Sequence, residues 1–157
     1  MPARTQTATV SPTNFVAGTD QRERRVLTAY DYANAEGTIR TGVTPECAVD
    51  PADGASLFLT WKFARLEKLL RIAYDPTRGS IANFENGGWY VDGTTATVTA
   101  VPAEGWRFLA WTGEVAVEDS GNNPLSLAMD VPHDVEAVFV PSATAETLSA
   151  TQGGEWF

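Results

Sequence analysis

Hydrophobic and polar residues alternate in short runs over the second half of the chain. From Leu69 onward these runs are separated by turn residues at intervals of roughly ten residues, a spacing typical of a small β-rich unit. The clearest run is 95–100, in which alanine and valine alternate with threonine and suit a pleated, half-buried strand. Residues 106–111 carry apolar side chains on both faces, which predicts a central strand. We expect further strands at 69–74, 80–84, 89–91, 125–129 and 135–140.

The beginning of the chain has a weaker pattern. Residues 1–19 are rich in threonine, alanine, serine and proline and are expected to form an extended arm. Residues 20–36 suit a helix that begins with a capping box at Asp20–Glu23, because apolar side chains follow at helical spacing. The same residues also suit a strand and a hairpin, since Val26, Thr28, Tyr30 and Tyr32 follow an alternating pattern. Both alternatives stay open at this point.

A second hydrophobic alternation covers residues 57–63 and places Trp61 on one face of a half-buried strand. The residues that follow, 65–69, are expected to form a tight connection or one helical turn. The predicted fold class is therefore mainly β. We divide the chain into an extended arm (1–19), a small β-rich anchoring or assembly region (20–68), a β module (69–140) and a C-terminal tail (141–157).

The charges are distributed unevenly along the 157 residues. Residues 1–72 hold nine basic and eight acidic residues, whereas residues 73–157 hold two basic and twelve acidic residues. The net charge of −9 thus belongs to the second half, which argues against nucleic acid as a partner because phosphate binding needs a basic surface. The nearly neutral first half is free to pack against other proteins, so we expect protein partners, through self-assembly or a shell or tail protein.

The sequence offers little material for catalysis or for a metal site. It has one cysteine, Cys47, and one histidine, His133, and no phosphate-binding glycine loop, zinc-protease helix or nucleophile elbow. The acidic stretch 114–123 lacks the regular spacing of a calcium loop and is interpreted as a solvated loop. We therefore expect no enzyme activity, no catalytic residue, no cofactor and no metal. Residues 1–10 lack the apolar core of a secretory signal, and no stretch approaches the roughly 18 apolar residues of a membrane span, so we expect no membrane insertion.

Turn and core residues between Leu69 and Val140 form a specific pattern. It contains a glycine-threonine turn, a valine-threonine-alanine strand, a proline-x-x-glycine turn and the spacing glycine-x-x-phenylalanine-x-x-tryptophan-x-glycine. The residues that carry it are Asp92-Gly93-Thr94, Val98-Thr99-Ala100, Pro102, Gly105, Phe108, Trp111 and Gly113, then Asn123-Pro124, Met129, Val135, Ala137 and Phe139. In these residues the stretch resembles the divergent internalin-B-type B-repeat, a module of bacterial surface proteins, in one copy. The resemblance implies a β-grasp-like or compact antiparallel fold that serves as a spacer, stalk or adhesive unit, without catalytic residues.

Large side chains in the alternating runs are the expected core, and other aromatic and basic residues are candidates for an interface. The expected core residues are Trp61, Val98, Phe108, Trp111 and Phe139. The cluster Arg22, Arg24 and Arg25 suits contact with a protein partner or forms a solvated face. Trp89 and the C-terminal pair Trp156 and Phe157 suit exposed anchors for a partner, and exposed aromatic rings can also stack on sugars.

Together these features predict a non-enzymatic structural or adhesive protein. The setting that we expect is a bacteriophage virion, as a capsid decoration or tail protein, with residues 1–68 anchored and residues 69–140 projecting outward. Two alternatives remain open. One is a fragment of a bacterial cell-surface adhesin or stalk in the extracellular space, and the other is a carbohydrate-binding module that binds a surface glycan through Trp89.

Overall fold

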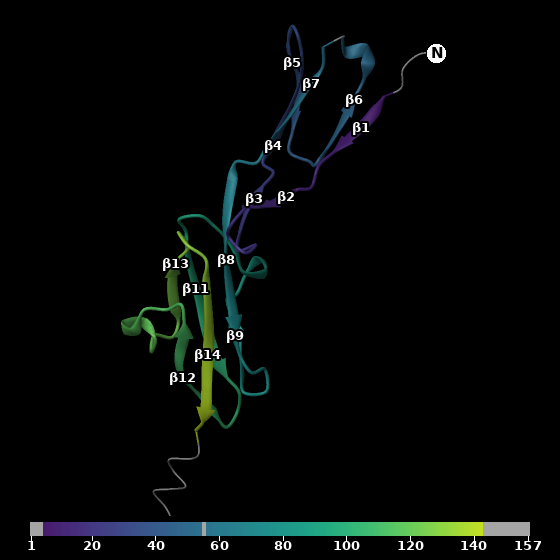
Figure 1. Cartoon of the computed structure of the whole chain (residues 1–157). Helices are drawn as coiled ribbons and strands as arrows, with labels where there is room; N and C mark the ends of the chain where they lie inside the picture. Colours follow the sequence, from purple (N-terminus) through teal and green to yellow (C-terminus); the bar gives the residue numbers. More distant parts are fainter. Residues whose placement is uncertain (1–4, 55, 143–157) are drawn as a thin grey trace, which may run out of the picture. The chain divides into compact units, whose positions relative to one another are not determined.

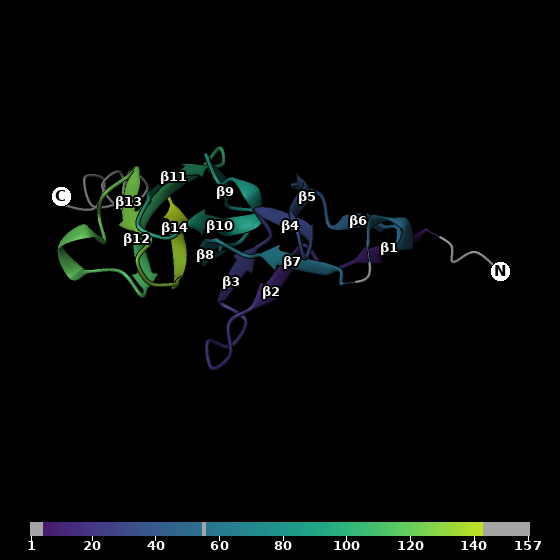
Figure 2. The same ribbon diagram turned by 90° about the horizontal axis from the view of Figure 1, so that it is seen from above.

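The computed structural model describes residues 5–54 and 56–142 (Figures 1 and 2). Strands dominate both halves of the chain, so the prediction of a mainly β fold is confirmed. The chain forms two compact units, Met1–Lys68 and Leu69–Phe157, which we call unit 1 and unit 2. Strand β8, Arg65–Ala73, begins in unit 1 and ends in unit 2.

Unit 1 consists of three small groups of paired strands. Strand β4 lies between β5 and β7 in an antiparallel sheet, β1 pairs with β6, and β3 pairs with β2 and with the first residues of β8. The residues predicted as an extended arm thus contribute two strands that pair within the same chain. The elements are β1 Gln6–Thr9, β2 Thr13–Phe15, β3 Glu23–Val26, β4 Ala29–Asn34, β5 Gly37–Gly42, β6 Glu46–Val49, β7 Phe58–Lys62 and the 3-10 turn η1 Pro51–Asp53.

Residues 20–36 form strands, so the strand alternative is correct and the helix alternative is wrong. The predicted capping box lies in a turn in which Asp20 and Gln21 adopt φ angles of 52° and 60°. A helix N-cap needs an extended backbone, and these left-handed angles are incompatible with it. Strand β4 pairs on both of its edges, and this tertiary pairing outweighs the local helical periodicity.

The predicted tight connection or helical turn at 65–69 is also wrong, because these residues belong to β8. Residues 65–68 pair with β3. Glu67 and Lys68 are buried, with 2% and 8% of their surfaces exposed. Burial of two charged side chains in one strand requires partners from another strand, and local sequence signals do not reveal such partners.

The core of unit 1 is small and aromatic. Tyr30, Tyr32 and Cys47 are buried, and Val49, Leu57, Leu59 and Trp61 pack against them half-buried. The rings of Tyr30 and Trp61 meet edge to face with their centroids 5.5 Å apart, a geometry that aromatic pairs prefer. Trp61, an expected core residue, therefore packs at the margin of this cluster.

Unit 2 contains two sets of paired strands. Strand β11 lies between β9 and β13, whereas β14 pairs in antiparallel fashion with β12 and in parallel fashion with the end of β8, which also pairs with β10. The elements are β9 Gly79–Ala82, β10 Trp89–Val91, β11 Thr95–Pro102, β12 Trp106–Gly113, β13 Leu125–Ala128 and β14 His133–Pro141, with 3-10 turns η2 Asn86–Gly88 and η3 Val117–Asp119. Figure 2 shows these strands from above.

The core of unit 2 is formed by the inward-facing residues of both sets of strands. Val98, Trp111 and Phe139 are buried, and Phe108 packs against them half-buried. The Phe108 ring lies 5.4 Å from the Trp111 ring and 6.4 Å from the Phe139 ring, centroid to centroid. The alternation in the first part of β11 produces this arrangement directly, because Ala96, Val98 and Ala100 are buried while the threonines between them face outward.

Side-chain hydrogen bonds tie the long loop between β12 and β13 to the strands. The Trp111 indole Nε1–H donates to the Asn122 carbonyl oxygen at 2.8 Å, and the Trp111 backbone N–H donates to the Ser120 carbonyl oxygen at 2.7 Å. The Asn123 amide bonds the backbone of Ala100 in both directions, accepting at 2.9 Å and donating at 2.8 Å. The loop is thus held by the core and by the edge of β11.

Candidate functional site

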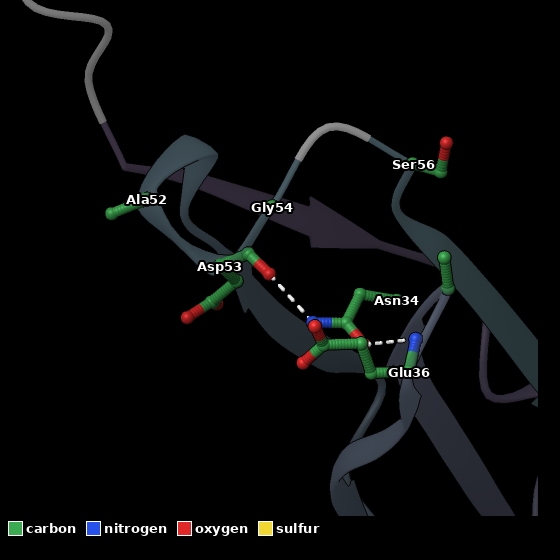
Figure 3. A pocket seen from close by; sticks show the side chains of 7 residues that line it. Asn34, Glu36, Ala52, Asp53, Gly54 and Ser56 are labelled. Carbon is green, nitrogen blue, oxygen red and sulfur yellow. Dashed lines mark hydrogen bonds between the residues drawn. The ribbon is translucent and has the colours of Figure 1, made fainter.

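A shallow hollow of about 260 Å³ lies in unit 1 beside η1 and the turn that joins β4 to β5 (Figure 3). The Asn34 side chain crosses it between the two turns. Its Nδ2 donates to the Asp53 carbonyl oxygen at 2.8 Å, and its Oδ1 accepts from the Glu36 backbone N–H at 2.9 Å. Through these bonds Asn34 braces the two turns that border the hollow.

The polar groups around Tyr32 also serve packing. The Arg40 guanidinium lies 4.8 Å from the centre of the Tyr32 ring and donates to the Ala48 carbonyl oxygen at 2.5 Å. The Tyr32 hydroxyl accepts from the Asp50 backbone N–H at 3.1 Å. Burial raises the pKa of the Tyr32 phenol above its ordinary value, so it stays neutral and acts as a hydrogen-bonded anchor rather than a base.

Ion pairs between β3 and β8 use part of the predicted basic cluster. Arg24 Nε donates to Glu67 Oε1 at 2.7 Å, and Arg65 Nε lies 3.3 Å from Glu67 Oε2. Lys68 Nζ pairs with the Glu23 carboxylate. Because Glu67 is buried, two arginines on one carboxylate compensate for its desolvation. This ladder explains how a strand with charged residues lies in the interior of unit 1.

The structure places the predicted interface residues in different environments. Arg24 belongs to the ion-pair ladder, Arg22 is half-buried at the end of a turn, and Arg25 is exposed on β3. Trp89 is half-buried at the start of β10, and its carbonyl oxygen accepts from the Asn86 side chain at 3.1 Å. The remaining candidates, Trp156 and Phe157, lie outside the described residues. Arg25 is therefore the most accessible of the described candidates.

The titratable groups outside the ladder stabilise turns. Asp75 accepts from the Thr77 backbone N–H at 2.9 Å and from its hydroxyl at 2.6 Å, and these bonds hold the pKa of the Asp75 carboxyl below its ordinary value. The two ring nitrogens of His133 each lie 3.0 Å from a carbonyl oxygen, of Glu114 and Ala128. Each of these side chains thus joins neighbouring backbone segments.

The described residues contain neither a cluster of metal-ligand side chains nor a membrane-spanning helix. Within 5–54 and 56–142, no three histidine, cysteine or acidic side chains are grouped to hold a metal ion. In the same ranges, no helix has the length and apolar character that crossing a membrane requires. The loop 114–123 carries its acidic residues in an exposed or half-buried setting.

A second hollow, of about 320 Å³, opens in unit 2 and differs from the first in its chemistry. Its lining consists of Asn83, Glu85, Tyr90, Thr95 and Thr97, from the β9–β10 connection, β10 and β11. These residues combine an amide, a carboxylate, an aromatic ring and two hydroxyls around one opening. Such a set can form hydrogen bonds to a polar ligand and contact an apolar face of it.

Sequence reasoning missed this hollow and selected its neighbour Trp89 instead. The exposed threonines of β11 were predicted correctly as one face of a strand, but which other segments face them depends on tertiary pairing. A local signal exists in Asn83, which adopts a φ of 64°. Asparagine tolerates this left-handed conformation better than most residues, and it marks the point where the chain leaves β9.

Comparison with known families identifies a domain in the second unit. Residues 70–143 match the sequence model of the divergent InlB B-repeat domain, which confirms the predicted B-repeat module. The match covers slightly under half of the chain and indicates a domain of the bacterial surface or adhesion type, consistent with a surface or extracellular location. Comparison with curated proteins and with solved structures gave no match.

Proposed function

We propose that the chain is a non-enzymatic structural and adhesive protein that displays unit 2 on a surface and contacts other proteins through unit 1. The observation that carries the proposal is the B-repeat match over a unit with its own closed core. The titratable side chains described above support this view, since they brace turns and strands.

The distribution of charge supports a division of labour between the units. Residues 1–68 hold eight basic and eight acidic residues, whereas residues 69–157 hold three arginines and twelve acidic residues. A strongly acidic unit remains soluble and repels copies of itself, which suits outward display. Both units expose large apolar side chains, such as Phe58 in unit 1 and Leu109 in unit 2, so it is their charge that distinguishes the units. Unit 1 has no net charge, which suits burial against partner proteins.

The specific setting that we propose is a bacteriophage particle, with the protein as a capsid decoration or tail component. Paired N-terminal strands and a nearly neutral unit 1 suit attachment to neighbouring subunits. The second candidate is a bacterial cell-surface adhesin or stalk, and the B-repeat match favours it because this family indicates surface domains of bacteria.

Antibodies against unit 2 distinguish the two settings. We expect them to label purified particles in electron micrographs and to leave uninfected cells unlabelled. The converse pattern, with labelled intact cells and unlabelled particles, would replace the virion with the cell-surface adhesin. Absence of labelling from both surfaces would reject surface display altogether.

A further inference from the structure

The hollow in unit 2 forms where a ladder of paired strands stops early. Strand β9 pairs with β11 as far as Ala82 opposite Thr99. At the next residue, Asn83, a φ of 64° turns the chain away from β11. The first four residues of β11, 95–98, lie beyond the end of this pairing with β9, and they pair with β13 on the other edge of β11. One edge of β11 is thereby left open beside Thr97, and the hollow lies at this edge.

The backbone of β11 presents polar groups at this open edge. Both backbone groups of Ala100 bond to Asn123, which lies two residues before the start of β13, so they point to the β13 side. Backbone groups of successive residues in a strand point to opposite edges, so those of Thr97 point toward the side that β9 leaves. Among the described residues, no backbone hydrogen bond joins residues 83–85 to Thr97. Thr97 therefore brings a backbone N–H and a carbonyl oxygen to this edge, while its hydroxyl lies on the exposed face of the strand.

The side chains around the opening add an aromatic surface and further hydrogen-bonding groups. Tyr90 packs half-buried against the core of unit 2, which fixes its ring, and its hydroxyl lies 3.5 Å from the Glu85 backbone nitrogen. Thr95, Asn83 and Glu85 are exposed on the other sides. A fixed aromatic ring among donors and acceptors suits a ligand with one apolar face and several hydroxyls at its rim.

The geometry points to a binding site for a neutral sugar unit of a surface glycan, formed by Asn83, Glu85, Tyr90, Thr95 and Thr97. This inference rests on the proposed adhesive function and names the ligand class of unit 2. The Asn83 amide and the Glu85 carboxylate would bond sugar hydroxyls, and the Tyr90 ring would pack against the C–H face of the sugar. The site thus differs from one centred on Trp89, which lies half-buried at the start of β10.

The negative charge of unit 2 favours neutral glycans over acidic ones. With twelve acidic residues and three arginines in residues 69–157, and with Glu85 in the hollow itself, sialylated and sulfated glycans would be repelled. Hydroxyl groups continue beyond the hollow, since Thr97 Oγ1 lies 3.3 Å from Ser126 Oγ on β13. A chain of more than one sugar unit could therefore run across the threonine face of β11.

The test is binding of the full-length protein to an immobilised panel of neutral, sialylated and sulfated oligosaccharides. We expect binding to neutral members, and the best neutral oligosaccharide is then titrated by calorimetry against variants. Asn83→Gly keeps the left-handed backbone and removes the amide, while Thr97→Val keeps the shape and removes the hydroxyl. Each is expected to weaken binding by about two- to tenfold, since a lost hydrogen bond to an uncharged ligand group costs about 0.5–1.5 kcal/mol.

Matched controls separate loss of the site from loss of the fold. Thr99→Val lies on the same strand outside the hollow and should bind as the parent protein does, and all variants should keep the parent melting temperature. Unchanged affinity in Asn83→Gly and Thr97→Val, preference for acidic glycans, or no glycan binding would overturn the site. In those cases, continued antibody labelling of particles or cells would leave the proposed surface function standing.

Discussion

Replacing Trp111 by alanine should nearly abolish the stability of unit 2. The side chain is 1% exposed and lies between the Phe108 ring and the loop that follows β12. Truncation of a buried tryptophan to alanine costs about 3–5 kcal/mol through lost burial and the remaining cavity. Loss of the 2.8 Å bond from Nε1 also leaves the Asn122 carbonyl oxygen unpaired, which adds about 1 kcal/mol. The free energy of unfolding of a domain of about 70 residues is only about 4–10 kcal/mol.

Hydrogen exchange measured by mass spectrometry on the full chain is the suitable assay, because it reports on each unit separately. Peptides from β11 and β14 should lose most of their protection in Trp111→Ala, whereas peptides from β4 and β7 of unit 1 should keep theirs. Trp111→Phe retains a large ring and loses the hydrogen bond, so we expect a cost of about 1–2 kcal/mol.

Trp106→Ala is the matched control on the same strand. Trp106 is half-buried and its ring centre lies 4.6 Å from the Arg78 guanidinium carbon, so its removal should cost about 1–2 kcal/mol. Equal loss of protection in Trp111→Ala and Trp106→Ala would refute the argument that burial and the indole bond make Trp111 the centre of the core. Unchanged protection in Trp111→Ala would refute it as well.

Three further predictions follow from single contacts. Arg24→Ala leaves the buried Glu67 with a weaker set of partners and should lower stability in urea unfolding by about 2–4 kcal/mol, whereas Arg25→Ala on the exposed side should change it by less than about 0.5 kcal/mol. Because the folded pKa of Asp75 lies below its ordinary value of 3.8, its charge stabilises the fold above that pH. Asp75→Asn should therefore melt earlier than the parent at neutral pH, and the difference should shrink as the pH falls below 3.8 and through the folded pKa of Asp75. Gly113 has a φ of 94°, and an added Cβ would lie 2.5 Å from the Asp134 carbonyl oxygen, so Gly113→Ala should lower the melting temperature of unit 2; an unchanged value would contradict the β12–β14 geometry.

The strands of the second unit were predicted from the sequence because their signals are local and mutually consistent. The prediction of a central strand at 106–111 was wrong, because β12 lies at the edge of its sheet and pairs with β14. The threonine alternation of β11 defines which face is buried, and the turn glycines and Pro102 divide the strands. The same residues carry the B-repeat pattern that the family comparison confirms. Where the hydrophobic period, the β propensity and the flanking turns of a segment all indicate a strand, few other secondary structures remain compatible with its sequence.

The first unit was read less completely because its local signals conflict. Residues 20–36 fit two periods, and only the pairing of β4 on both edges decides for strands. Residues 65–69 were predicted to form a tight connection or one helical turn, yet they belong to β8, where Glu67 is buried and pairs with Arg24 and Arg65. Arg24, which pairs with Glu67, lies more than 40 positions before it in the sequence, so no local pattern could reveal this ion pair.

The sequence by itself determined that the protein is mainly β, that its acidic charge belongs to the second half, and that this half contains a B-repeat-like module. The tertiary structure alone decided where β9 leaves β11 and thus where the threonine face meets Tyr90 and Asn83. The physical reason is that strand alternation is encoded by neighbouring residues, whereas the end of a ladder and the hollow beside it depend on how distant segments pair.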